Sequence, residues 1–175
     1  MNIVVLTGSP RRTGHSNSLA DSFVKGAKEA GNEVYRFDAG LQKQGVVHFL
    51  RVDENERTIV DDDFIHQEVL PRLIKADMVV FVASLYYFGM NAQLKTVIDR
   101  FYEFNHELKD DKKSVFLLAG YGSGESFQAM ITHFELLQKY MRWSEFGRVI
   151  ADDSWTERKF KKHLEEAYLL GKSIK

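Results

Sequence analysis

The first 27 residues contain the feature that most constrains the fold: a short buried strand, a polar loop and an amphipathic helix. Residues 3–6 are isoleucine, valine or leucine and run into Gly8 and Pro10, a pattern typical of a buried strand that ends in a loop. Open α/β sheets bind ligands at the carboxyl ends of their strands, so the sequence predicts a ligand-binding loop here. Beyond the loop, apolar residues recur on one face of a helix, at Leu19, Ala20, Phe23, Val24 and Ala27.

The composition of this loop favours a phosphate group. Its side chains offer hydroxyls, an amide and positive charge, from Ser9, Arg11, Arg12, Thr13, Ser16, Asn17 and Ser18. Gly8 and Gly14 let backbone N–H groups approach a ligand, and the following helix presents the positive end of its dipole. The stretch contains neither G-x-x-x-x-G-K-[ST] nor G-x-G-x-x-G, so it predicts a phosphate monoester rather than a triphosphate or a dinucleotide. The alternative is an ordinary turn whose serine and asparagine residues only cap the helix.

The overall composition narrows the class of protein. A chain of 175 residues with 44% hydrophobic and 28% charged residues suits a single globular domain over residues 1–175. The net charge of −1 gives no case for nucleic acid or an anionic membrane as a partner. The absence of cysteine excludes disulfides, thiolate iron–sulfur ligation and cysteine nucleophiles, and it fits a cytoplasmic protein. The sequence predicts no signal peptide, no membrane span and, from the spacing of its six histidines, no metal site.

Strands and helices are expected to alternate along the rest of the chain. The patterns predict strands at 33–38, 78–83, 114–119 and 148–151, and helices ending near 75, 102, 141 and 172. Residues 46–52 and 57–60 could pair across the turn 53–56, as a hairpin inserted near residues 45–60. Asp61, Asp62 and Asp63 then begin a helix, where capping is the expected role and a metal site the alternative.

Two further loops follow predicted central strands and complement the first. Residues 84–91 form an aromatic loop, and residues 120–126 form a glycine-rich one. The carboxyl ends of parallel strands share one edge of a sheet, so all three loops are expected to meet there. A ligand site with one polar end and one flat aromatic end suits FMN. The alternatives are core packing for Tyr86, Tyr87 and Phe88, and an ordinary turn for 120–124.

The quoted motifs are similar to those of a known family. The stretches 8–11, 16–18, 85–95 and 98–101 resemble the flavodoxin-like NAD(P)H-dependent FMN reductases, a family that also contains iron–sulfur flavoproteins and quinone reductases. The resemblance implies an α/β three-layer sandwich with a five-stranded parallel sheet in the order 2-1-3-4-5. It also implies FMN as cofactor, NAD(P)H as electron donor and a homodimer with the flavin near the interface.

By position, the resemblance also implies the residues that contact the cofactor. The phosphate contacts fall on Ser9, Arg11, Ser16, Asn17 and Ser18. The ring contacts fall on Ser84, Leu85, Tyr86, Tyr87, Phe88 and Gly89, with Gly120, Tyr121 and Gly122 on the far side. No catalytic side chain is expected, because a flavin supplies the chemistry, and the Asp99-Arg100 pair is interpreted as structural.

Two departures from the family pattern bear on function. Many relatives have proline where Ser84 stands, so the ring loop is expected to be less rigid. Many also carry a cysteine cluster in the region that corresponds to 40–60, whereas this chain has none, so the iron–sulfur branch is not supported.

The leading hypothesis is an enzyme that passes two electrons, by ping-pong hydride transfer, from NAD(P)H through FMN to a small acceptor. Quinone, nitro, azo and flavin compounds are the acceptor classes that the resemblance implies. A flavodoxin-type electron carrier and a flavin-free binding or regulatory protein are the alternatives. The near-neutral charge and the insertion count against the carrier, and the intact loops count against the flavin-free protein.

Overall fold

A five-stranded parallel sheet forms the centre of the protein. The structure, a computed structural model, describes residues 1–43, 46–60 and 62–175. The sheet contains β1 (Asn2–Thr7), β2 (Glu33–Asp38), β5 (Met78–Tyr86), β7 (Lys113–Ala119) and β8 (Ser144–Ala151). Their order is β2-β1-β5-β7-β8, with every neighbouring pair parallel. This is the flavodoxin-like order 2-1-3-4-5, and it confirms the predicted fold class.

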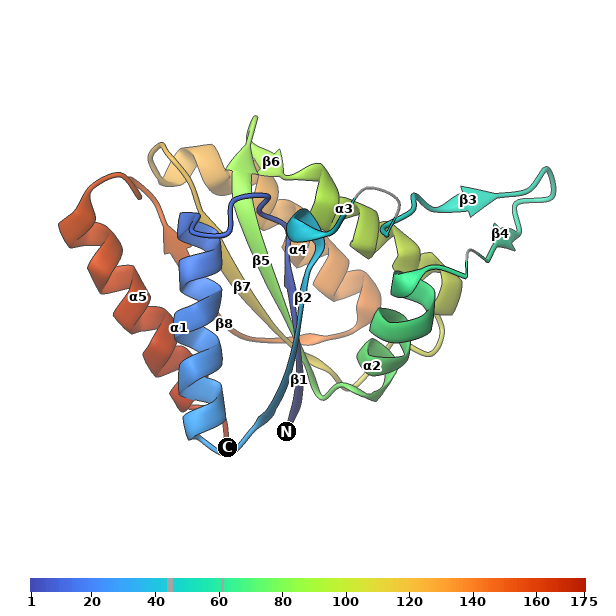
Figure 1. Ribbon diagram of the computed structural model, residues 1–175, viewed down its shortest axis with the longest axis horizontal. Helices are drawn as coiled ribbons and strands as arrows, with labels where there is room; N and C mark the ends of the chain where they lie inside the picture. The colour runs from blue at the N-terminus through green and yellow to red at the C-terminus, as the bar shows by residue number, and fades with distance from the viewer. Residues whose placement is uncertain (44–45, 61) are drawn as a thin grey trace.

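Helices cover both faces of the sheet (Figure 1). One face carries α1 (His15–Glu29) and α5 (Glu157–Lys172), and the other carries α2 (Leu70–Lys75), α3 (Ala92–Asp99) and α4 (Gln128–Met141). Short helical turns complete the connections: η1 (Ala39–Leu41), η2 (Ile65–Val69), η3 (Arg100–Phe104) and η4 (Gly124–Phe127).

The strands separate two hydrophobic cores by simple alternation. In β1, Ile3 and Val5 pack in the core beneath α1 and α5, whereas Val4 and Leu6 pack in the core beneath α2, α3 and α4. Successive side chains of a strand point to opposite faces, so a continuous apolar run is what a doubly covered strand requires. The buried run at residues 3–6 therefore places the loop after β1 at the carboxyl edge of the sheet.

Several element boundaries differ from the sequence prediction. The first helix begins at His15, so Ser16, Asn17 and Ser18 belong to its first turn and not to the loop. Strand β5 continues to Tyr86, where residues 78–83 were expected, because Leu85 and Tyr86 pair with β6 (Gly89–Met90). Strand β8 begins at Ser144, four residues before the apolar run that signals it, because parallel pairing with β7 extends the strand beyond that run.

The segment between β2 and α2 forms an arm that extends from the body (Figure 1). Its strands β3 (Arg51–Val52) and β4 (Thr58–Ile59) pair antiparallel over two residues each, within the longer stretches that the sequence indicates. The Asp53 carboxylate closes the turn by accepting the N–H groups of Asn55 and Arg57, at 2.9 and 2.8 Å. Residues 44, 45 and 61 lie outside the described residues, and with them the capping role predicted for Asp61.

Within the described residues, no helix combines the length and the apolar character that crossing a membrane requires.

Candidate functional site

A cavity of about 390 Å³ lies where the three predicted loops meet. Its walls come from the carboxyl ends of β1, β5 and β7 and from the segment after β8. The lining residues are Ser9, Arg11, Thr13, Gly14, His15, Ser16, Ser84, Leu85, Tyr86, Ala119, Gly120, Tyr121 and Ser154. The volume lies within the range of roughly 300–1,000 Å³ that small-molecule sites occupy.

The polar end of the cavity is the first turn of α1. Its N-cap residue, Gly14, has no side-chain capping hydrogen bond, and the first backbone bond of the helix runs from the Ser18 N–H to the Gly14 carbonyl. The N–H groups that precede Ser18 in the helix therefore remain for a ligand. The alternative that Ser16 and its neighbours only cap this helix gains no support, because among the described residues their side chains accept no hydrogen bond from the N–H groups of this turn.

Arg11 and Ser9 border the same end. The Ser9 side chain is buried, and its Oγ accepts the Arg11 N–H at 3.2 Å, which fixes the loop backbone. The Arg11 side chain takes part in none of the ion pairs found in the described part of the chain, so its charge faces the cavity uncompensated. A guanidinium, hydroxyls and helix N–H groups are a donor set suited to a phosphate.

Two of the predicted phosphate contacts support the loop instead of lining the cavity. The Asn17 Nδ2 donates to the Arg11 carbonyl at 2.8 Å, and the Ser18 Oγ donates to the Gly14 carbonyl at 3.3 Å. Both side chains therefore fix the backbone that carries Arg11 and Gly14.

A hydrogen bond joins the polar loop to the aromatic loop. The Ser16 Oγ and the Ser84 Oγ lie 2.8 Å apart, and both residues line the cavity. The bond to Ser16 therefore restrains Ser84, the position at which the sequence predicted a less rigid loop.

The aromatic loop is a tight hairpin between β5 and β6. Its two central residues, Tyr87 and Phe88, have left-handed backbones with φ of 46° and 67°. This is the pattern of a type I′ turn, which normally selects asparagine and glycine. Leu85 and Tyr86 line the cavity, whereas Tyr87, 99% exposed, and Phe88 lie at the tip outside the lining, next to Gly89. Two bulky residues in this conformation store strain of about 1–2 kcal/mol each.

The glycine-rich loop approaches the opposite side of the cavity. A side chain at Gly120 would place its Cβ 2.5 Å from the Leu85 Cβ, so only glycine fits between the two loops. Gly122 has φ of 120° and lies outside the lining. Its carbonyl accepts the Asp153 N–H at 3.2 Å.

The segment after β8 contributes residues that sequence reasoning missed. Ser154 lines the cavity and donates its hydroxyl to the Gly120 carbonyl at 3.1 Å. Trp155 packs against Tyr121, with ring centroids 5.1 Å apart. The sequence signal that could have identified these residues is their position after the last strand, at the same edge of the sheet as the other loops.

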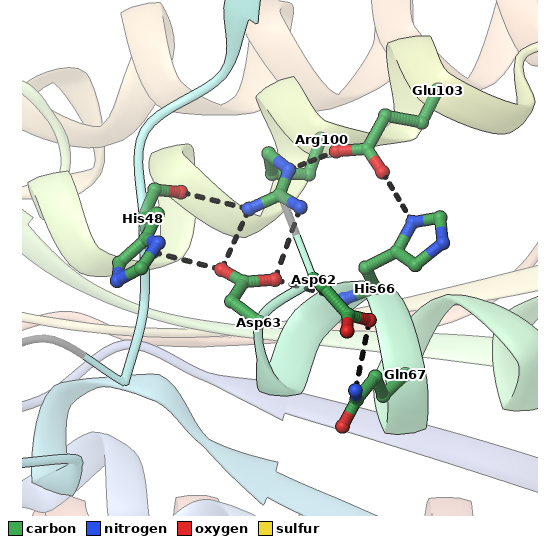
Figure 2. Close-up of polar contacts among 7 residues, drawn as sticks. All are labelled: His48, Asp62, Asp63, His66, Gln67, Arg100 and Glu103. Atoms are coloured by element: carbon green, nitrogen blue, oxygen red, sulfur yellow. Dashed lines mark hydrogen bonds and ion pairs between the residues drawn. The ribbon is translucent and has the colours of Figure 1, made fainter. Parts of the chain in front are cut away.

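A buried charged cluster lies away from this cavity, beneath the arm (Figure 2). Arg100 donates to both oxygens of the Asp63 carboxylate, at 2.7 and 3.0 Å, and also bonds Glu103. Glu103 in turn meets the His66 Nδ1 at 2.8 Å. Arg100, Asp63 and Glu103 have side chains only 1–3% exposed, so the arginine is paired inside the protein, as expected for a structural residue.

The surroundings of Asp63 favour its charged form. Burial by itself raises the pKa of this carboxyl, but the bonds from Arg100 and from the N–H groups of His66 and His48 outweigh burial and lower it. The His66 N–H lies 3.0 Å from Asp63 Oδ1, which is the capping role predicted for the aspartates. Among the described residues, no three histidine or acidic side chains are arranged to hold a metal ion.

Comparison with known proteins agrees with the fold and the loops. The family model for NADPH-dependent FMN reductase matches residues 1–157. YwqN of Bacillus subtilis, described as an NAD(P)H-dependent FMN-containing oxidoreductase, is 26% identical over 166 residues, covering 87% of this chain and 85% of that protein. An iron–sulfur flavoprotein of Archaeoglobus fulgidus is 28% identical over 129 residues, covering 71% of this chain and 58% of that protein.

A solved structure shares the fold at lower identity. The NAD(P)H:quinone oxidoreductase of Methanothermobacter marburgensis superposes with a TM-score of 0.74 at 17% identity, covering 97% of this chain and 94% of that one. The family match covers most of the sequence, although the chain has no cysteine with which to hold an iron–sulfur cluster. The chain therefore belongs to the NADPH-dependent FMN reductase family.

Proposed function

We propose that this enzyme binds FMN in the cavity at the ends of β1, β5 and β7 and passes two electrons from NAD(P)H to a small-molecule acceptor. One observation carries the proposal: a single cavity joins a donor-rich anion end, at Ser9, Arg11 and Ser16, to an end lined by Leu85, Tyr86, Gly120 and Tyr121. The residues present fit FMN, since that molecule has a phosphate at one end and a flat ring system at the other.

Different residues bind the phosphate end and the ring end of FMN. Arg11, Ser9, Ser16 and the first N–H groups of α1 hold the phosphate. Leu85 and Tyr86 border one side of the ring, and Gly120 and Tyr121 the other. When bound, FMN accepts a hydride equivalent and passes the electrons on, so no side-chain nucleophile is required.

The residues outside the lining support this arrangement. Asn17 and Ser18 fix the phosphate loop, while the turn of Tyr87, Phe88 and Gly89 holds Tyr86 at the rim. The Gly122 carbonyl anchors the glycine-rich loop.

The remaining assignments rest on family likeness. Quinone, nitro, azo and flavin compounds are the proposed acceptors, and solved structures with the same fold include both an azoreductase and a quinone oxidoreductase. A homodimer and a cytoplasmic location are proposed on the same ground. A flavodoxin-type carrier is the second candidate, and it would accept electrons from a partner protein without reacting with NAD(P)H.

The purified protein is expected to be yellow and to carry one FMN per chain. Adding NADPH without oxygen should bleach the visible flavin absorbance, which separates a reductase from a carrier. Iron and sulfide analysis serves as the control and should give background values, because the chain has no thiolate ligand. A colourless protein that takes up no FMN would contradict the proposal.

Steady-state kinetics should give parallel double-reciprocal lines when NADPH is varied at several quinone concentrations. The cavity, of about 390 Å³, is a single site for the flavin, so donor and acceptor are expected to occupy the exposed ring face in turn. Lines that intersect would mean that both bind together, and would contradict the ping-pong order.

A further inference from the structure

A second and larger cavity, of about 830 Å³, lies behind the wall of the first. Its lining comes from η1, from the base of the arm and from the first turns of α3: Ala39, Gly40, Gln42, Lys43, Val47, His48, Phe49, Arg51, Ala92, Gln93 and Thr96. Nothing in the proposed binding of FMN uses this groove.

The two cavities are separated by one thin wall. A Cβ added to Gly40 would lie 2.2 Å from the Gly8 carbonyl oxygen and 2.4 Å from the carbonyl carbon of Ser9. Ser9 lines the first cavity and Gly40 the second, so the backbone of the loop after β1 touches that of η1 between them. On the other side, Leu85 lines the first cavity, and the strand that pairs with it leads into Ala92 of the second. The two cavities are therefore direct neighbours in the fold.

The chemistry of the groove suits an anion attached to an aromatic base. Lys43 and Arg51 bring positive charge, and among the described residues that line the groove none carries a carboxylate. Gln42 and Gln93 bring amides that can both donate and accept hydrogen bonds. The N-cap of α3, Asn91, makes no side-chain capping bond, so the first N–H groups of that helix add to the anion-binding character.

Phe49 adds an aromatic surface at the edge of the groove. Its side chain is 76% exposed, which is unusual for phenylalanine. An exposed ring offers its face to the base of a nucleotide, and stacking of this kind contributes substantially to affinity.

The buried cluster of Figure 2 fixes the backbone that carries this ring. The His48 N–H donates to Asp63 Oδ2 at 3.1 Å, and the His48 carbonyl accepts from Arg100 Nη1 at 3.1 Å. Both backbone groups of the residue before Phe49 are thus held by a salt bridge inside the protein. The wall of the groove is therefore preorganised, which lowers the entropy lost when a ligand binds.

We propose that this groove binds the adenosine phosphate half of NAD(P)H, while the nicotinamide end reaches the flavin in the adjoining cavity. The inference rests on the proposed function. The first cavity is filled by one flavin, so the rest of the donor needs a separate site, and the adjoining groove offers cations, amides and an aromatic ring. The arm that supplies Phe49 and Arg51 thereby becomes part of donor recognition.

The test compares NADPH with reduced nicotinamide mononucleotide, a donor that lacks the adenosine half. In the holoenzyme, Phe49→Ala should lower kcat/KM for NADPH about tenfold, by removal of one stacking surface. The same variant should leave kcat/KM for the truncated donor unchanged. Lys43→Gln should act in the same direction, because it removes a charge that faces the phosphates.

Matched controls separate the groove from the arm as a whole. Val60→Ala changes another exposed apolar residue of the arm that does not line the groove, and Lys28→Gln changes an exposed lysine of α1. Both should leave the two donors unaffected. Equal losses with both donors in Phe49→Ala, or equal kcat/KM for the two donors in the wild type, would overturn the inference.

Failure of the proposed function gives a different result, since neither donor would then reduce the flavin. In that case, calorimetric titration with adenosine 2′,5′-bisphosphate decides. Binding to the wild type that is lost in Phe49→Ala would support the groove as an adenosine phosphate site, and no binding to the wild type would overturn it.

Discussion

Replacing Arg100 with methionine is expected to lower the free energy of unfolding by about 3–5 kcal/mol, the usual effect of breaking a buried ion pair. The variant leaves two carboxylates, those of Asp63 and Glu103, in the protein interior without their guanidinium partner. It also removes the bond to the His48 carbonyl, so the base of the arm loses an anchor. Urea denaturation of the two proteins at neutral pH measures the difference.

An exposed arginine provides the matched control. Arg142 pairs with Asp110, but the two side chains are 64% and 46% exposed, so Arg142→Met should change stability by only about 0–1 kcal/mol. Similar small effects for Arg100→Met and Arg142→Met would show that the buried cluster contributes nothing beyond a surface pair.

The same variant should change how stability depends on pH. Because the pKa of Asp63 is lowered in the folded protein, its contribution is present above the ordinary carboxyl pKa of about 4 and is lost as the pH falls through the folded value. In Arg100→Met, only the N–H groups of His66 and His48 still oppose the effect of burial on the pKa of Asp63, so this part of the acid-induced loss of stability should become smaller.

Replacing Arg11 with alanine should weaken FMN binding by roughly ten- to a hundredfold, if its guanidinium meets the phosphate. Loss of one charge-assisted hydrogen bond removes about 1.5–3 kcal/mol, and each 1.4 kcal/mol is about tenfold in the dissociation constant. Riboflavin has the same ring without the phosphate, so its weaker binding should barely change. Quenching of flavin fluorescence during titration measures both ligands.

The neighbouring arginine is the control for charge. Arg12 is exposed and lies outside the cavity lining, so Arg12→Ala should leave the affinity for FMN close to that of the wild type. Equal affinity of the wild type for FMN and riboflavin would mean that the loop after β1 binds no phosphate. The cavity would then need a different ligand.

The local sequence was sufficient for the alternation of strands and helices and for part of the site, whereas the order of the strands in the sheet followed from the family resemblance. Short apolar runs such as residues 3–6, when a glycine or proline turn follows, are typical of central strands that are buried on both faces, so approximate strand positions followed from the pattern. The carboxyl ends of these strands must share one edge, and the cavity contains residues from all three predicted loops, among them Ser9, Tyr86 and Gly120. These features depend on residues close together in the chain, where periodicity and turn chemistry are informative.

Which side chains face the cavity was decided by the tertiary structure. Asn17 and Ser18 look like ligand contacts in sequence, but one additional helical turn directs them to the backbone of their own loop. Tyr87 and Phe88 continue the aromatic motif, yet the pairing of β5 with β6 carries them to the tip of a hairpin.

Contacts between distant parts of the chain also determined the buried cluster and the second cavity, which no sequence motif indicates. Asp63 and Arg100 are 37 residues apart, and their pairing depends on how α2 and α3 pack on the sheet. The second cavity brings together three separate segments, and Ser154 reaches the first only because β8 lies beside β7. Sequence patterns thus determined the succession of strands and helices along the chain, because each element depends on local burial. Which residues line each cavity depended instead on packing between distant segments.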